Sequence, residues 1–158
     1  MTRARDVAKP ALALRVQRAA APRGLPHAST VRRWAARTLE GDVSVTVRFV
    51  DGREGRALNR QYRGRDYATN VLTFVYDDGA SLAGDIVLCA PVVRREARAQ
   101  RKTLVAHYAH LVIHGMLHLQ GYDHARNADA GRMEAREVAL LRDLGYADPY
   151  AEHSGHPR

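Results

Sequence analysis

The chain has 158 residues, 46% of them hydrophobic, which is typical of one globular domain with a substantial core. Its single cysteine, Cys89, excludes an intramolecular disulfide, and no apolar run reaches the roughly 20 residues that a membrane-spanning helix needs. Lysine and arginine total 25 against 17 aspartate and glutamate residues, and the resulting net charge of +8 favours anionic partners such as RNA, DNA or nucleotides.

The first half of the chain is rich in β-branched and alternating segments, which are typical of strands. Ser29 or Thr30 provides the N-cap of the first expected helix. In chain order, the sequence predicts a strand over Ala11–Ala19, a helix over Val31–Leu39, a strand over Val43–Val50, a helix over Glu54–Tyr62, and strands over Val71–Tyr76 and Gly84–Cys89.

The second half has helical spacing, with a proline, a threonine cap and a glycine at the expected boundaries. It predicts helices from Pro91 to Lys102, from a cap at Thr103 to Leu119, and over Asp129–Leu144. Strands followed by helices indicate the α+β class. We therefore expect a single domain over 1–158, a mixed β-sheet flanked by helices with a central histidine-bearing helix, and flexible ends over 1–10 and 147–158.

The N-terminal stretch does not have the form of a secretion signal. Arg15 and Arg18 interrupt its apolar residues, so no continuous hydrophobic segment follows the first basic residues. Together with the lone cysteine, this predicts a cytoplasmic protein without membrane association.

The predicted helix that follows Thr103 carries an unusual stripe of histidines. His107, His110, His114 and His118 fall within an arc of roughly 80° on a helical projection, whereas the rest of the helix is almost wholly apolar. An apolar helix is expected to be buried, and buried polar groups cost free energy unless each has a partner. The stripe therefore calls for an explanation such as a bound metal ion.

Spacing selects three of these histidines as ligands. His114 and His118 are four residues apart and can share one ion, as can His110 and His114. His124 follows a glycine turn directly after His118 and can fold back towards it, whereas His110 is about two helical turns further away. We therefore assign the metal to His114, His118 and His124, and interpret His107 and His110 as groups that support the ligands or face the substrate.

Three protein nitrogens leave one position of a tetrahedral zinc ion open, which is the arrangement of a catalytic site. We expect one Zn²⁺ per chain, with a bound water of lowered pKa next to His114.

Zinc proteases with the HExxH motif carry their general base directly after the first histidine, but here that residue is Gly115. The base is then zinc-bound hydroxide or a carboxylate from elsewhere, and Asp123 and Asp85 are candidates. Gly115 itself indicates either close approach of substrate or backbone, or tight packing.

The motif HGMLHLQGYDH at 114–124 resembles the H-G-x-L-H-L-x-G-Y-D-H signature of the YbeY family almost position for position. Two further segments resemble the same family in order and spacing: LNRQYRGRDYATNVLTF at 58–74 and GDIVLC at 84–89. The resemblance covers most of residues 40–145, and the ends of the chain match only loosely.

The resemblance implies a metal-dependent endoribonuclease that is specific for single-stranded RNA. Family members act in ribosomal RNA maturation, notably at the 3′ end of the 16S RNA, and in ribosome quality control. The resemblance also implies that the three motif histidines bind zinc and that Arg63 lines the cleft and handles RNA. We expect Arg63 to neutralise charge on the scissile phosphate. The implied partners are single-stranded RNA or rRNA and the small ribosomal subunit or its proteins.

Other residues receive weaker assignments. Arg65 is a candidate for a flanking phosphate. Asp85 either orients a ligand histidine or serves a turn or salt bridge. Tyr122 either stacks on a base or packs internally. The arginines at 94, 95, 98 and 101 either follow the RNA backbone or form a solvated helix face.

Two other functions stay open at this point. One is a ribosome assembly factor that binds rRNA and holds a mainly structural metal. The other is a hydrolase of small amides or nucleotides, which requires a narrow enclosed pocket. An open coordination position favours the nuclease, because structural zinc is normally closed by four protein ligands.

Overall fold

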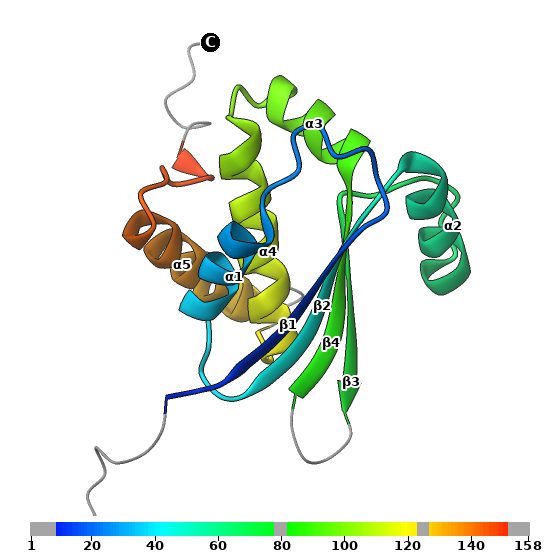
Figure 1. Cartoon of the computed structure of the whole chain (residues 1–158). Helices are drawn as coiled ribbons and strands as arrows, with labels where there is room; N and C mark the ends of the chain where they lie inside the picture. Colours follow the sequence, from blue (N-terminus) through cyan, green and yellow to red (C-terminus); the bar gives the residue numbers. More distant parts are fainter. Residues whose placement is uncertain (1–8, 78–81, 123–126, 152–158) are drawn as a thin grey trace, which may run out of the picture.

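The computed structural model describes residues 9–77, 82–122 and 127–151 (Figure 1). Within these residues the chain forms one mixed sheet with the strand order β1-β2-β4-β3. The strands are β1 (Leu12–Arg18), β2 (Val43–Val50), β3 (Val71–Asp77) and β4 (Leu82–Cys89). The helices are α1 (Ala28–Arg37), α2 (Gly52–Arg63), α3 (Ala90–Ala99), α4 (Leu104–Leu119) and α5 (Asn127–Asp143).

The sheet is mixed because β1, β2 and β4 run parallel whereas β3 pairs antiparallel with β4. Strands β3 and β4 follow each other in the chain, so a short connection joins them, while the parallel pairs need the helical crossovers that α1, α2 and the following segments supply. The α+β class, the mixed sheet and the central histidine-bearing helix that the sequence predicts are all confirmed. Strands β1 and β3 form the two edges of the sheet.

The helices lie on both faces of the sheet (Figure 1). Helices α1 and α4 cover one face, α5 packs against α4, and α2 lies on the opposite face. Among the helices of the described residues, none combines the length and the apolar character required to cross a bilayer.

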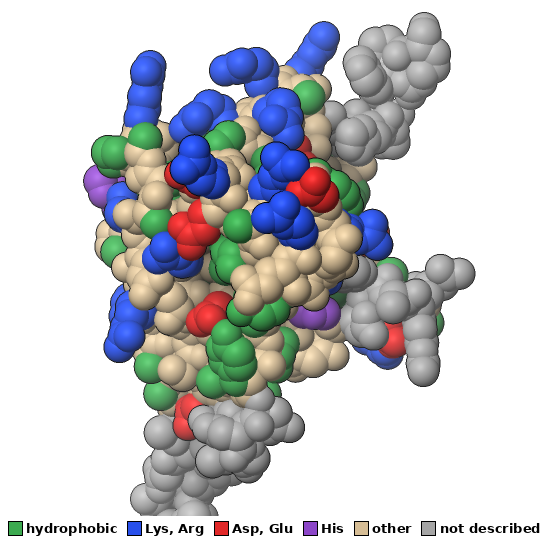
Figure 2. All heavy atoms as spheres, turned by 90° about the vertical axis from the view of Figure 1, so that its right-hand side faces the viewer, with side chains coloured by type: hydrophobic (Ala, Val, Ile, Leu, Met, Phe, Trp, Pro, Cys, Tyr) green, Lys and Arg blue, Asp and Glu red, His purple; other side chains and the backbone are tan. Residues whose placement is uncertain are grey.

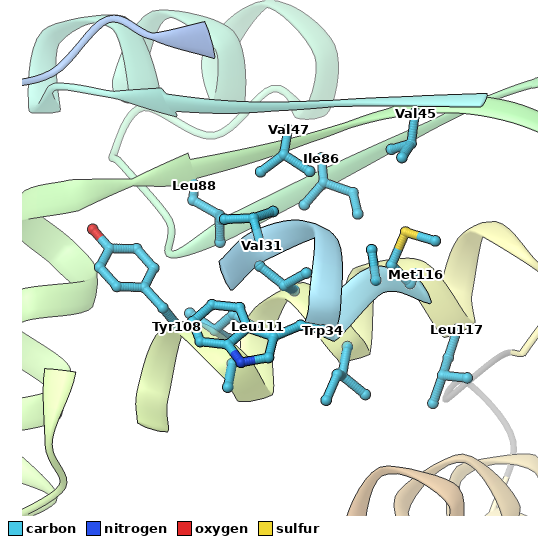
Figure 3. Packing of buried hydrophobic residues seen from close by; sticks show 14 of the residues in the cluster. Val31, Trp34, Val45, Val47, Ile86, Leu88, Tyr108, Leu111, Met116 and Leu117 are labelled. Atoms are coloured by element: carbon cyan, nitrogen blue, oxygen red, sulfur yellow. The ribbon is translucent and has the colours of Figure 1, made fainter. Parts of the chain in front are cut away.

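Alternate residues of β4 pack on opposite faces of the sheet, as the pleat of a strand requires. Ile86 and Leu88 belong to the main core together with α1, α4 and α5, whereas Val87 and Cys89 belong to a smaller cluster on the α2 side. Figure 3 shows Ile86 and Leu88 pointing from the sheet towards Tyr108 and Met116 of α4. The strand is therefore buried on both sides.

Helix α4 is the centre of the main core. Gly115 faces Ile86, and a Cβ atom on this glycine would lie only 2.9 Å from Cδ1 of Ile86. Of the two explanations offered by the sequence for Gly115, tight packing against the sheet accounts for it. Because the helix is held this closely, the side chains on its other faces are rigidly placed.

Local sequence explains the helix boundaries. The Asp51 carboxylate accepts a hydrogen bond from the backbone N–H of Glu54, and Thr103 Oγ1 accepts from that of Ala106, so both residues cap helices. The Asp51 cap starts α2 two residues before the predicted Glu54. Helix α3 ends at Ala99 and not at Lys102, because Arg101 adopts a φ of 57°, which no helix continues through.

Candidate metal centre

His114 and His118 lie on neighbouring turns of α4, on the side that faces neither the sheet nor α1. Both side chains are half-buried, and that of His114 is 25% exposed. Because α4 is packed on the sheet by its apolar faces, these two imidazoles are presented from a rigid element at the four-residue spacing that allows two ligands to share one ion.

A buried carboxylate on α5 lies beside these histidines. Glu137 has no exposed surface, and its Oε2 atom lies 2.6 Å from Nδ1 of His114. Its Oε1 atom lies 3.0 Å from Nε2 of His110 and also accepts a hydrogen bond from the Tyr150 hydroxyl. Since an ionised carboxylate only accepts hydrogen bonds, His114 donates through Nδ1 and His110 through Nε2.

These bonds determine the charge of Glu137. Burial alone raises the pKa of a carboxyl group, but the donors His110, His114 and Tyr150 outweigh this effect and lower the pKa of Glu137 to about 2. Glu137 is therefore an anion at neutral pH. Its negative charge lies next to Nδ1 of His114 and fixes both the tautomer and the orientation of that ring. The Nε2 atom of His114 is then the nitrogen through which this residue would bind a metal.

The same bonds distinguish His110 from His114. The Nε2 atom of His110 is engaged by Glu137 and lies 3.2 Å from the Tyr150 hydroxyl. That nitrogen is therefore not available to a metal ion, and through it His110 supports the carboxylate that orients His114. The Nδ1 atom of His110 is buried and has no hydrogen-bond partner among the described residues. This position fits a group that supports the ligands, which is one of the two roles that the sequence suggests for His110.

Tyr150 belongs to the segment that the sequence predicted to be flexible from residue 147. Up to residue 151 that expectation is not met, because Pro149 is buried and the Tyr150 hydroxyl is bound to Glu137. Burial and, after it, hydrogen bonding to this carboxylate both raise the pKa of Tyr150. A segment outside the regular elements is thus held by a polar contact that composition does not reveal.

His107 has a purely internal place. It is 3% exposed, and its Nε2 atom lies 2.9 Å from Oε1 of Glu96, which also accepts a hydrogen bond from the side-chain amide of Asn70. Burial lowers the pKa of His107 despite the nearby Glu96, so the ring is neutral near pH 7. A substrate-facing role for His107 is therefore wrong: the residue has no surface for RNA, and it links α4 to α3 and to the start of β3.

The third expected ligand, His124, lies outside the described residues, as does Asp123. Within the residues that the structure does describe, no group of three or more His, Cys, Asp and Glu side chains is placed to hold a metal ion. The turn that leads to His124 is nevertheless anchored. The Gln120 side chain accepts from the backbone N–H of Glu40 and donates to the carbonyl of Thr38, which ties the end of α4 to α1.

Asp85 lies away from the histidines. Its neighbours Ile86 and Gly84 face α4, so Asp85 faces the α2 side of the sheet. There its Oδ2 atom accepts a hydrogen bond of 2.6 Å from the Tyr76 hydroxyl. The carboxylate that contacts a histidine of the motif is therefore Glu137. The suggestion that Asp85 orients a ligand is corrected accordingly, and the sheet also separates Asp85 from the position of a general base.

Tyr122 has an internal role of the kind that the sequence offered as its alternative. Its ring packs against the main core, and its hydroxyl donates a 2.6 Å hydrogen bond to Glu40, which raises the pKa of Tyr122.

Arg94 donates to the carbonyl of Arg23, so this member of the α3 arginine run is used within the fold. Arg95, Arg98 and Arg101 are exposed.

Arg63 and Arg65 are exposed at the end of α2 and in the loop that follows. Both line a small pocket of about 170 Å³ beside the first residues of β3, together with Tyr67. The structure brings these two predicted residues together. The pocket lies at the β3 edge of the sheet, and the chain of contacts from Asn70 through Glu96 to His107 links this edge to α4.

Sequence reasoning missed Glu137, Tyr150 and Glu96. A signal for Glu137 exists in the sequence, since it occupies a core position of an amphipathic helix, four residues from each of the buried Met133 and Leu141. A carboxylate on an apolar helix face needs a partner. The partner itself, 23 residues earlier in the chain, could not be identified without the fold.

Comparisons with known proteins agree over most of the chain. A family model described as "Endoribonuclease YbeY" matches residues 27–145. A curated relative from Aromatoleum aromaticum, named Endoribonuclease YbeY, is 56% identical over 149 residues, which cover 92% of this chain and 97% of the relative. Another of that name, from Cupriavidus necator, is 57% identical over 129 residues, which cover 80% of this chain and 65% of the relative.

A protein of Thermotoga maritima whose structure was solved in solution is also similar. It is 28% identical, with a TM-score of 0.54 over 83% of this chain and 91% of the other. The shared fold and the identity of more than half of the residues over nearly the full length leave the family in no doubt. The chain belongs to the Endoribonuclease YbeY family.

Proposed function

We propose that this chain is a zinc-dependent endoribonuclease that cleaves single-stranded RNA. We further propose that it acts in ribosomal RNA maturation, at the 3′ end of the 16S RNA, and in ribosome quality control in the cytoplasm. The name carried by its relatives supports RNA cleavage, and the net charge of +8 suits a polyanionic substrate. The small ribosomal subunit or its proteins are the expected partners.

The contact between His114 and Glu137 is the observation that carries the metal assignment. A histidine that binds zinc almost always donates its other ring nitrogen to a carboxylate, carbonyl or water, and the Nδ1 atom of His114 donates to a fully buried carboxylate at 2.6 Å. His118 lies one turn further along the same face, so the donor set fits zinc. His114, His118 and His124 would hold the ion.

When bound there, zinc supplies Lewis acidity and a water molecule of lowered pKa. The remaining chemistry is that of the chain. Glu137 holds the His114 ring in one tautomer, and the packing of α4 on the sheet fixes its position. Arg63 donates to the scissile phosphate and stabilises the charge that grows there in the transition state. Gly115 provides no carboxylate next to the ligands, so cleavage by the HExxH protease mechanism is disfavoured.

The test is cleavage of a defined single-stranded RNA by the purified, zinc-loaded chain. We expect His114→Ala to abolish cleavage and Arg63→Ala to reduce it by about 100-fold or more, the size of effect found for a lost transition-state donor. His27→Ala and Arg53→Ala remove an exposed histidine and an exposed arginine from elsewhere, and should leave the rate unchanged.

Equal cleavage by the wild type, His114→Ala and Arg63→Ala would indicate a contaminating nuclease and overturn the proposal. A wild-type chain that holds zinc and binds RNA without cleaving it would instead support the assembly factor, whose metal is structural. Accumulation of unprocessed 16S 3′ ends in cells that contain only His114→Ala is the expected result for the ribosomal role.

A further inference from the structure

Four aromatic side chains gather on the α2 side of the sheet, and we call them the tyrosine surface: Tyr62, Tyr67, Phe74 and Tyr76. The three tyrosines are among the most exposed large hydrophobic residues of the described chain, at 57%, 53% and 51%. Tyr62 comes from α2, Tyr67 from the loop after it, and the other two from β3. Exposed apolar rings that cluster in this way mark interaction sites.

The rings are held in place from behind. Tyr62 packs edge-on against Phe74, with ring centroids 5.1 Å apart. Tyr76 lies two residues further along the same face of β3, and its hydroxyl donates to Asp85. This hydrogen bond raises the pKa of Tyr76 to about 12, so the hydroxyl remains a donor throughout the neutral range. The rings of Tyr62 and Tyr76 are thus held in place before any partner binds.

Arginines adjoin these rings. Arg63 and Arg65 line the small pocket beside Tyr67, and Arg65 Nη1 lies 3.4 Å from the Tyr67 hydroxyl. Arg56 of α2 is paired with Asp66, whereas no ion pair of Arg63 or Arg65 is found among the described residues. Figure 2, which views the α2 side, shows basic side chains gathered above a hydrophobic area.

The edge strand β3 brings the tyrosine surface near the end of α4, because β3 contacts both β4 and α4. The carbonyl oxygen of Phe74 and Cδ1 of Leu119 both lie within 3 Å of the position that a Cβ atom on Gly84 would take. Leu119 directly follows His118 on α4. Since β3 is the edge of the sheet, an extended polymer can cross that edge from the α2 side to the end of α4.

We propose that the tyrosine surface binds unpaired bases of the RNA substrate next to the cleaved bond, while Arg65 binds a phosphate that adjoins the scissile phosphate held by Arg63. This inference rests on the proposed function and adds to it the part of the surface that selects single strands. Bases stack on exposed aromatic rings in proteins that bind single-stranded nucleic acids, and arginines follow the backbone. In a duplex the base faces are already stacked on each other, so paired RNA cannot use these rings.

Charge complementarity favours RNA over a protein as the occupant. A protein partner would need an acidic face to match Arg63 and Arg65. A single strand offers both phosphates for these arginines and flat bases for the neighbouring rings. The rings and the arginines also come from one continuous stretch, residues 62–76, that ends at the edge strand beside α4.

The experiment measures binding of the zinc-loaded chain to a short single-stranded 2′-O-methyl RNA by fluorescence anisotropy, with gels to confirm that the strand stays intact. We expect Tyr62→Leu and Tyr76→Leu each to weaken binding by about 5- to 100-fold, the effect typical of one lost stacking ring. Tyr76→Phe keeps the ring and should bind within about 2-fold of the wild type. Val105→Ala, which shortens an exposed apolar residue on α4, should change nothing.

Two further probes identify the source of the loss. A strand with abasic sites should bind the wild type and Tyr62→Leu equally, and a duplex should bind both equally. Unchanged single-strand binding by both leucine variants overturns the inference, and so does an equal loss for single strand and duplex. A wild type that binds no RNA also overturns it and directs attention to a protein partner.

The binding experiment can refute the tyrosine surface without refuting the nuclease, and the reverse also holds. A wild type that binds RNA in a tyrosine-dependent way but does not cleave it refutes the nuclease and leaves the surface assignment in place. Cleavage with unchanged KM by both leucine variants refutes the surface assignment and leaves the nuclease in place.

Discussion

The Nδ1 atom of His114 lies 2.6 Å from Oε2 of Glu137, a carboxylate with no exposed surface. Two helices, α4 and α5, meet at this contact. Because the carboxylate is buried and charged, it holds the imidazole more firmly than a neutral acceptor would. The metal-binding nitrogen of the proposed site therefore depends on a residue that never touches the ion.

We expect Glu137→Gln to lower the affinity for zinc by about 10- to 100-fold, the usual effect of removing a partner behind a metal ligand. The amide keeps the shape of the side chain but loses the negative charge at His114. Competition with a chromophoric chelator measures this change without reference to activity. Glu134→Gln, at an exposed position on the same helix, is the matched control and should bind zinc as the wild type does. Equal affinity in both variants would contradict the positioning role.

The choice of ligands can be tested by metal content after identical purification. We expect His118→Ala and His124→Ala to lose zinc, because each removes one of three nitrogens from the proposed site. His110→Ala should retain it, since the Nε2 atom of His110 is engaged by Glu137. Loss of zinc from His110→Ala with retention in His124→Ala would reverse the assignment.

We expect Gly84→Ala to destabilise the fold by about 3 kcal/mol or more, at the upper end of overpacking effects. A Cβ atom at this position would lie 2.3 Å from the backbone oxygen of Phe74, which cannot move without shifting β3. Urea unfolding measures the change. The control is Gly131→Ala on α5, where the added methyl meets no atom within 4 Å and helix propensity should stabilise the chain by roughly 0.5–1 kcal/mol. A neutral Gly84→Ala would contradict the close packing of β3 and β4.

Stability should fall on mild acidification, partly through His107. Burial lowers its pKa in the folded state, so below the unfolded value of about 6.5 the unfolded chain binds a proton that the folded chain does not. The contribution of His107 is fully present above that pH and is lost as the pH falls, by at most about 1.4 kcal/mol per pH unit for one proton. Urea unfolding from pH 7.5 to 5 should show a steeper decline for the wild type than for His107→Gln. Parallel curves would contradict this account.

Local sequence patterns predicted most of the fold. The β-branched runs, the Thr103 cap and the positions of Pro91 and Gly145 located the strands and the later helices to within a few residues, because these signals act through neighbouring residues in the chain. Asp85 is a residue whose position such local signals could not predict. Its strand is apolar on both faces, so alternation did not reveal which side Asp85 occupies.

By itself the sequence determined that a buried helix carries a histidine stripe, since helical periodicity is a property of one segment. Only the tertiary structure decided which carboxylate lies behind His114, that His107 is enclosed by Glu96, and that Tyr150 is tied to the core. The physical reason is separation along the chain. Glu137 lies 23 residues from His114, and Tyr150 13 residues from Glu137, so these contacts exist only once α5 has packed against α4.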